Sequence, residues 1–373
     1  MQAAQRTPWG TIIAAVAVSR GLLFLVGLLT LQLHGRDAPT GWDAWIALSC
    51  RWDCNWYGTI LEHGYGYASP GQSGATNWSF YPLLPLLVAA LQTLAGIDDY
   101  RAAGMLLSTT LLVVALALIH RHARLLGNSE GVAVTSVWLV AFLPQGIVFS
   151  STYTESLFLA LLAGTMVAMR QQRSPAAGLC AAALSATRSN GIFVLVFILA
   201  TLWMQRGTRA FLRPWREPIA YLPLLMAPLG AFAFWTYAFL STGDAFAMTS
   251  SVRHGWGWAW ESPLSNLPMY WDLGFNARVW MVGSLFAACC TMLVLYYRWY
   301  PEFALAVVVF ILVWGGVVPN SLWRYSMVLY PAWIALARAL EHRDSMRLAL
   351  FGALGLIGGF AMHAWALDFL VTI

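Results

Sequence analysis

The chain has 373 residues, of which 60% are hydrophobic and only 10% are charged, and its mean hydropathy is +0.65. This composition excludes a soluble globular protein and indicates a chain that is embedded in a lipid bilayer. The net charge of +5 does not indicate nucleic-acid binding, because the 21 basic residues are all arginine and many of them fall in short loops between apolar segments.

Apolar segments recur along the chain at about the length that crosses a hydrocarbon core of roughly 30 Å as a helix. Backbone polar groups in lipid must be paired within their own segment, so these segments are expected to be helices. We predict crossings at residues 10–33, 101–120, 130–150, 153–169, 174–188, 190–205, 218–241, 278–297, 301–318, 324–340 and 346–367. The predicted fold class is an all-α polytopic membrane protein of about 11 transmembrane helices, as one domain over residues 1–373.

The apolar stretch 80–96 is predicted to lie along the outer surface as a helix that does not cross. It begins FYPLLP, whose prolines disfavour a regular helix start, and it ends at Asp98 and Asp99. A crossing at this point would move Arg121 and Arg124 to the outer side. The outer loop 34–100 then contains both the motif RWDCNWY and this helix.

The orientation follows from four basic clusters, since short loops rich in arginine remain in the cytoplasm. The clusters lie at residues 121–124, 170–173, 206–216 and 338–347. With all four inside, the N-terminus is cytoplasmic and the C-terminus is outside. Arg20 falls within the first span, and we expect it to bind a backbone carbonyl or an acid of a neighbouring span.

In this orientation the unusual polar residues share the outer face. Asp53 lies in the loop 34–79, Glu155 in the corner SSTYTES, Arg188 and Asn190 in the corner ATRSNG, and Arg324 in the corner NSLWRYS. An ionisable group near the membrane centre costs about 2.5–3.5 kcal/mol, so several at one depth favour a functional site. The alternative is that each residue caps a helix or pairs locally.

The cysteines give no metal site, because their spacing fits no zinc pattern. Cys180, Cys289 and Cys290 lie in apolar spans and resemble small core residues. Cys50 and Cys54 are four residues apart beside Asp53, a spacing that allows a bridge, but a pair of reduced thiols is the expectation.

The outer polar set favours glycosyl transfer from a lipid-phosphate sugar. A carboxylate can act as general base toward a hydroxyl nucleophile. Arginines at the same level can bind a phosphate through their guanidinium groups. Tryptophan and tyrosine stack on sugar rings, and they are dense outside, including the run GWGWAW in the outer loop 242–277.

The chain also resembles a known family. The segments RWDCNWYGTILEHGYGY, FYPLLPLL, LPQGIVFSSTYTESLF, SATRSNGIF and LWRYSMVLYPAW, over about residues 50–335, are similar to the PIG-V family of GPI-anchor mannosyltransferases and its bacterial relatives. The family belongs to the GT-C superfamily. The resemblance implies a GT-C-like bundle with external juxtamembrane helices in the first outer loop, a catalytic aspartate in that loop and a polyprenyl-phosphate sugar donor.

The resemblance implies a role for each matching residue. Asp53 becomes the general base, and Glu155, also predicted to be catalytic, forms a second element of the site with Tyr153 and Thr154. The residues expected to surround Asp53 or to bind the donor phosphate and sugar are Arg51, Trp52, Tyr57, Tyr153, Arg188, Asn190, Arg324 and Tyr325. The implied reaction is an inverting single displacement without cofactor or metal.

The implied partners are a polyprenyl-phosphate-linked sugar donor, a lipid or glycan acceptor and the bilayer, with no nucleic acid. Mannose as the sugar follows from the family name alone. The short, compact form of the chain favours a bacterial inner (plasma) membrane enzyme with its site on the outer, periplasmic face. Two alternatives stay open: a transporter or flippase of a lipid-linked substrate, for which the short spans between 174 and 205 would suit a midplane site, and a non-catalytic subunit of the same fold.

Overall fold

Helices account for nearly all regular structure in the computed structural model, which describes residues 7–35, 41–68, 74–319 and 321–369. Arg6, Asn320 of the corner NSLWRYS and parts of the loop 34–79 lie outside the described residues. The α helices are α1 (Trp9–Leu33), α2 (Trp42–Ser49), α3 (Asp53–His63), α4 (Leu83–Ala95), α5 (Tyr100–Leu125), α6 (Glu130–Ala141), α7 (Glu155–Arg170), α8 (Ser174–Ser185), α9 (Val194–Phe211), α10 (Pro218–Met226), α11 (Leu229–Thr242), α12 (Ala247–Trp256), α13 (Pro263–Asp272), α14 (Phe275–Tyr296), α15 (Tyr300–Trp314), α16 (Leu322–Met327), α17 (Pro331–Ala339) and α18 (Asp344–Ala366). Short 3-10 helices occur at Asn77–Ser79, Gly146–Ser150, Ser189–Phe193 and Pro214–Arg216.

Six helical segments are long and apolar enough to cross a membrane: Trp9–Leu33, Tyr100–Leu125, Ser189–Phe211, Pro218–Thr242, Phe275–Tyr296 and Asp344–Ala366. Every other predicted crossing also contains helix, but in shorter pieces. The segment 130–150 is helical only to Ala141 before a 3-10 turn, and 324–340 divides into α16 and α17. The all-α membrane fold is confirmed, whereas eleven crossings remain a prediction.

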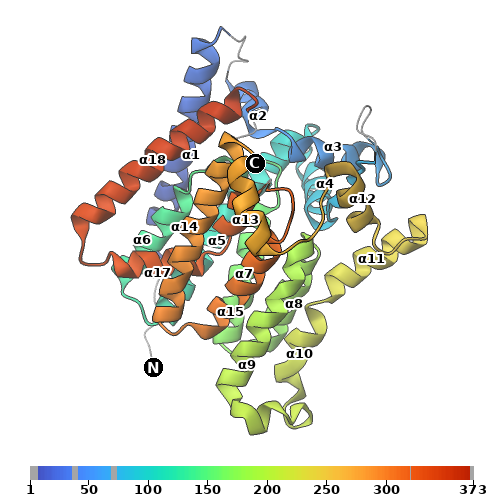
Figure 1. The fold of residues 1–373 in the computed structure, drawn as a ribbon, viewed down its shortest axis with the longest axis vertical. Helices are drawn as coiled ribbons and strands as arrows, with labels where there is room; N and C mark the ends of the chain where they lie inside the picture. The colour runs from blue at the N-terminus through green and yellow to red at the C-terminus, as the bar shows by residue number, and fades with distance from the viewer. Residues whose placement is uncertain (1–6, 36–40, 69–73, 320, 370–373) are drawn as a thin grey trace.

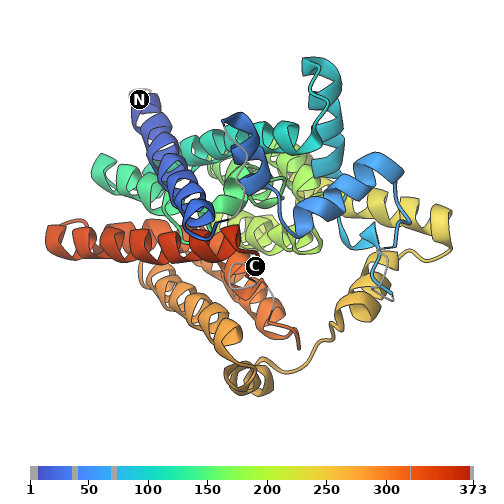
Figure 2. The ribbon, with the colours of Figure 1, turned by 90° about the horizontal axis from the view of Figure 1, so that it is seen from above.

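Helix α7 lies within the bundle and has Glu155 as its first residue and Arg170 as its last. It packs against α5 and α8, while α5 also packs on α6 and α14 on α17. Figures 1 and 2 show α18 lying across the bundle against α1, in agreement with their contacts. With 16 residues at 1.5 Å each, α7 is about 24 Å long.

The apolar stretch 80–96 forms α4, a helix of 13 residues that packs against α3 and α5. At 1.5 Å per residue it is about 20 Å long, which is less than a hydrocarbon core of roughly 30 Å. Its C-terminus is closed by Gly96 in the left-handed conformation, followed by the turn that leads into α5. Its place on the outer surface stays a prediction.

The basic clusters lie together at the end of the bundle away from α3. Ser129 after α5 hydrogen-bonds Glu341 after α17, and His122 of α5 and Arg170 of α7 both contact Glu302 of α15. The end of α9 also hydrogen-bonds the end of α7. In Figure 1 the link between α9 and α10 is at the bottom, whereas α2, α3 and α12 are at the upper end.

Arg20 shows how the first span tolerates a buried cation. Its guanidinium donates to the carbonyl of Ala141 at 2.7 Å and to that of Gly146. These carbonyls lie where α6 ends inside the bundle, and carbonyls at a helix end have no partner within their helix. The prediction that Arg20 binds a backbone carbonyl is therefore confirmed.

Candidate functional site

Asp53 is the first residue of α3, immediately after a sharp turn of the backbone. Trp52 precedes it with φ of 41°, a value that is uncommon for a large side chain. The Trp52 ring packs edge-on against Trp365 of α18, with centroids 4.9 Å apart. The side chain of Asp53 is 23% exposed, so it can meet a substrate.

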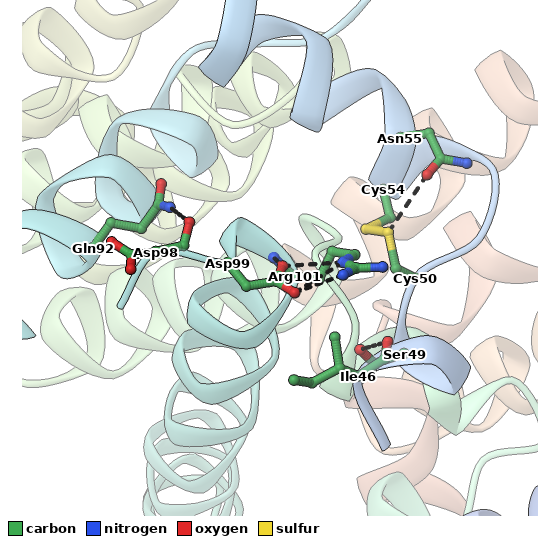
Figure 3. A network of polar contacts seen from close by, with 9 residues as sticks. All are labelled: Ile46, Ser49, Cys50, Cys54, Asn55, Gln92, Asp98, Asp99 and Arg101. Carbon is green, nitrogen blue, oxygen red and sulfur yellow. Dashed lines mark hydrogen bonds and ion pairs between the residues drawn. A yellow bond between two sulfur atoms is a disulfide. The ribbon is translucent and has the colours of Figure 1, made fainter. Parts of the chain in front are cut away.

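A disulfide joins Cys50 to Cys54 and closes the turn that contains Asp53 (Figure 3). The expectation of two reduced thiols is therefore wrong. The turn from α2 into α3 brings the two Cα atoms within 5.2 Å, and both residues are buried. The spacing in the sequence permitted this pairing but could not reveal the turn that produces it.

Four charged side chains from four separate segments form one ion-pair chain. Arg324 of α16 contacts Asp53, with Nη1 2.6 Å from Oδ2, and also Glu155 at the start of α7, with Nε 3.1 Å from Oε1. Arg188 after α8 contacts the same Glu155 oxygen at 3.1 Å. The Asp53–Arg324 pair joins residues 271 apart in the sequence, so these two side chains do not pair with neighbours on their own helices.

These four residues, Asp53, Glu155, Arg188 and Arg324, form the charge cluster, and they differ in burial. Glu155 is fully buried, Arg324 is 4% exposed and Arg188 is 9% exposed, so Asp53 is the most accessible of the four. Two carboxylates and two guanidinium groups sum to zero formal charge. A buried ion requires a close partner, since its desolvation is otherwise unfavourable by several kcal/mol. Removing one member therefore leaves the others unbalanced.

Two tyrosines pack against the guanidinium groups. The ring of Tyr325 lies 4.4 Å from Arg188 and 5.6 Å from Arg324, measured from the guanidinium carbon to the ring centroid. The ring of Tyr153 lies 5.2 Å from Arg324. Aromatic faces attract guanidinium groups at these distances and fix their planes. Tyr325 is only partly buried, so it borders the site.

The remaining predicted residues lie nearby with different partners. Arg51 turns away from Asp53 and pairs with Asp368 after α18, at 2.7 Å. Asn190 lines an apolar cavity between α7, α8 and α15. Tyr57 is buried beside the site, and burial, with the nearby carboxylate of Asp53, raises the pKa of its hydroxyl. Tyr57 is therefore neutral at physiological pH.

Sequence reasoning missed two features. Trp365 and Asp368 of the C-terminal segment contact the Asp53 turn, and nothing local in the sequence links them to a loop over 300 residues earlier. A second buried set, His122 and Tyr330 with Glu302 and Arg170, lies at the opposite end of α7. The sequence feature that could have indicated this set is the position of its histidine and glutamate at the ends of apolar segments.

No cluster of three or more His, Cys, Asp or Glu side chains within the described ranges is arranged to hold a metal ion. The site presents carboxylates, guanidinium groups and aromatic rings. A partly exposed carboxylate next to two arginines can accept a proton on one side and bind an anion on the other.

Comparison with known proteins places most of the chain in one family profile. The profile described as Mannosyltransferase (PIG-V) matches residues 39–313. This range includes Asp53, Glu155 and Arg188 but ends before Arg324. Arg324, which pairs with Asp53, therefore comes from a part of the chain beyond the match.

Among curated proteins, GPI alpha-1,6-mannosyltransferase 2 of Mus musculus is 27% identical over 372 residues, which cover 85% of this chain and 69% of that protein. The protein of the same name from Cricetulus griseus is 30% identical over 158 residues, covering 40% of this chain and 30% of its own length. Among solved structures, the Archaeoglobus fulgidus oligosaccharyltransferase is 16% identical with a TM-score of 0.43, over 92% of this chain. This chain spans about half of that longer protein, 53%.

Proposed function

The chain belongs to the PIG-V family of mannosyltransferases, and from that premise we propose that it transfers mannose from a polyprenyl-phosphate donor to an acceptor hydroxyl, with Asp53 as general base. The observation that carries the proposal is the charge cluster, in which the accessible carboxylate of Asp53 is paired with the guanidinium of Arg324. An acid-base group and an anion-binding group are thereby adjacent, as displacement of a phosphate by a hydroxyl requires.

In the proposed reaction Asp53 takes the proton of the acceptor hydroxyl as its oxygen attacks the anomeric carbon of the sugar. The bond from that carbon to the phosphate oxygen breaks, and polyprenyl phosphate leaves with the electron pair. A single displacement inverts the anomeric configuration. The donor arrives already activated, so its own phosphate serves as the leaving group.

The charge balance of the cluster supports this assignment. Before the reaction its two acids and two arginines sum to zero, and protonation of Asp53 leaves a net charge of +1. The leaving phosphate gains one negative charge in the same step. A site whose positive charge grows as the leaving group becomes more negative stabilises the transition state more than the ground state.

Glu155 has a different role in this proposal from that of Asp53. It is fully buried and contacts Arg188 and Arg324 through one carboxylate oxygen. We propose that Glu155 orients both guanidinium groups toward the donor phosphate. Tyr325 supplies the aromatic face between those groups, and Tyr57 lies beside the same site.

We propose that this site faces the outer side of a bacterial plasma membrane, with the N-terminus in the cytoplasm. The basic loops gather at the end of α7 that carries Arg170, about 24 Å from the end that carries Glu155. Short arginine-rich loops stay in the cytoplasm. The Cys50–Cys54 disulfide at the Glu155 end supports an oxidising compartment on that side.

The test uses the purified protein in lipid nanodiscs with polyprenyl-phosphate [3H]mannose and a membrane extract of the source organism as acceptor. We expect labelled product and free polyprenyl phosphate in equal amounts, with an inverted anomeric configuration. GDP-[3H]mannose in place of the lipid donor is the matched control and should give no product. Retention of configuration would overturn the single displacement. Movement of the intact donor across the bilayer without release of phosphate would instead favour a flippase.

A further inference from the structure

The turn that carries Asp53 is held from three directions by groups that cannot themselves meet a substrate. The Cys50–Cys54 disulfide closes the turn (Figure 3). Cys54 is fully buried. The bridge spans only Arg51, Trp52 and Asp53. A loop this short removes little freedom from the unfolded chain, so the main effect of the bridge is on local geometry.

Tyr153 holds the same turn from inside the bundle. Its hydroxyl donates to the carbonyl of Arg51 at 3.0 Å and accepts from the backbone N–H of Asp53 at 3.2 Å. These two groups flank Trp52, whose φ of 41° is unfavourable unless the surroundings fix it. Tyr153 is 1% exposed, so its hydroxyl is shielded from solvent while it makes these two hydrogen bonds.

Trp365 holds the turn from the C-terminal helix α18. Its indole N–H donates to the carbonyl of Leu48 at 2.6 Å, at the end of α2, and its ring packs against Trp52. Trp365 is fully buried. Both ends of the turn are therefore fixed, one through Leu48 and the other through the N–H of Asp53.

We infer that the Cys50–Cys54 disulfide, the Tyr153 hydroxyl and the Trp365 indole are positioning groups for Asp53, and that full turnover requires the oxidised cysteine pair. The inference rests on the proposed function, because it assigns these groups to the placement of the proposed base. Forming the bridge takes two electrons and two protons from the thiols to a disulfide oxidant such as oxidised glutathione. A dithiol such as dithiothreitol reverses the step and becomes a cyclic disulfide.

Position matters at this site because proton transfer depends steeply on distance. A displacement of about 1 Å in a reacting group can lower a rate by about 100-fold. The carboxylate of Asp53 has two competing demands, since it must stay 2.6 Å from Arg324 and also face the acceptor hydroxyl. If the turn could relax, Asp53 would keep its ion pair with Arg324 but would lose its alignment with the acceptor hydroxyl.

The first measurement is a thiol count in the intact protein, which does not depend on activity. The chain has five cysteines, and two in the bridge leave three free thiols, Cys180, Cys289 and Cys290. Maleimide labelling of denatured protein should therefore find three thiols without reductant and five after dithiothreitol. Five thiols without reductant, in membranes prepared under alkylating conditions, would overturn the inference whatever the activity.

The second measurement is turnover by Tyr153→Phe and by the double variant Cys50→Ser/Cys54→Ser. We expect kcat to fall at least 10-fold in each, with the donor KM within twofold of wild type. Tyr296→Phe and Cys289→Ala, at exposed positions, are the matched controls and should keep wild-type kcat. Reduction under mild denaturation should lower the kcat of wild type. Reoxidation by oxidised glutathione should restore it.

Wild-type kcat in both Tyr153→Phe and the double variant would overturn the inference, as would a loss seen only in KM. If the double variant does not fold, Tyr153→Phe still decides, because it removes one oxygen and keeps the ring. If wild type transfers no sugar from any polyprenyl-phosphate donor while the thiol count is three, the proposed function fails and the disulfide stands.

Discussion

Arg324→Gln is the perturbation that best tests the coupling within the charge cluster. Arg324 contacts Asp53 at 2.6 Å and Glu155 at 3.1 Å and is almost fully buried. Removing one partner of a buried ion pair is destabilising by about 3–5 kcal/mol. The low end applies here, about 3 kcal/mol, because Glu155 keeps Arg188 and the partly exposed Asp53 can be hydrated.

The measurement is a double-mutant cycle by thermal unfolding in nanodiscs. Asp53→Asn alone should lower the free energy of unfolding by only about 1 kcal/mol, because Arg324 keeps its ion pair with Glu155. The variant that combines both substitutions removes one charge of each sign and leaves the Glu155–Arg188 pair intact, so we expect a loss of about 2 kcal/mol, well below the additive value of about 4 kcal/mol. At about 2 °C per kcal/mol, Arg324→Gln should lower Tm by about 6 °C.

Arg253→Gln, at an exposed position, is the matched control and should stay within about 0.5 kcal/mol of wild type. A loss in Arg324→Gln no larger than in this control would refute the reasoning. Strict additivity in the combined variant would also refute it, because the two side chains would then not interact.

Arg188→Lys keeps the charge but loses the planar stack on Tyr325, so we expect kcat/KM for the donor to fall about 10-fold, measured by product formation at low donor concentration. Gly191→Ala should lower unfolding stability by about 1–3 kcal/mol, because its Cβ would overlap a backbone carbonyl at the end of α8; an unchanged Tm would contradict this packing. Arg20→Met leaves the carbonyl of Ala141 without its partner and should lower Tm by an amount equivalent to about 1–3 kcal/mol, whereas a higher Tm would show that the cation is dispensable.

The fold class was predictable because a membrane helix is identified by length and apolar composition. Residues 10–33 and 101–120 were predicted close to the observed α1 and α5. The breaks inside other segments were not predicted. The segment 130–150 ends as helix at Ala141, just before Pro144, and Arg20, over 100 residues earlier, binds the freed carbonyl. Composition does not encode such a distant partner.

The charge cluster was predictable only as a set of residues. Asp53, Glu155, Arg188 and Arg324 were singled out because ionisable groups are rare near the membrane, and the structure brings them into contact. Their pairing was not predicted. Arg51 is two residues from Asp53 in the sequence yet pairs with Asp368, because the turn directs the two side chains to different sides.

The measurement that tests the central proposal most directly compares wild type with Asp53→Asn in a single turnover of polyprenyl-phosphate [3H]mannose. General base catalysis accounts for about 10²–10⁴-fold in rate, so the account predicts a loss in this range with donor binding within a few-fold of wild type. Equal single-turnover rates in the two proteins would contradict Asp53 as the base and would leave Glu155 as the only other carboxylate of the charge cluster.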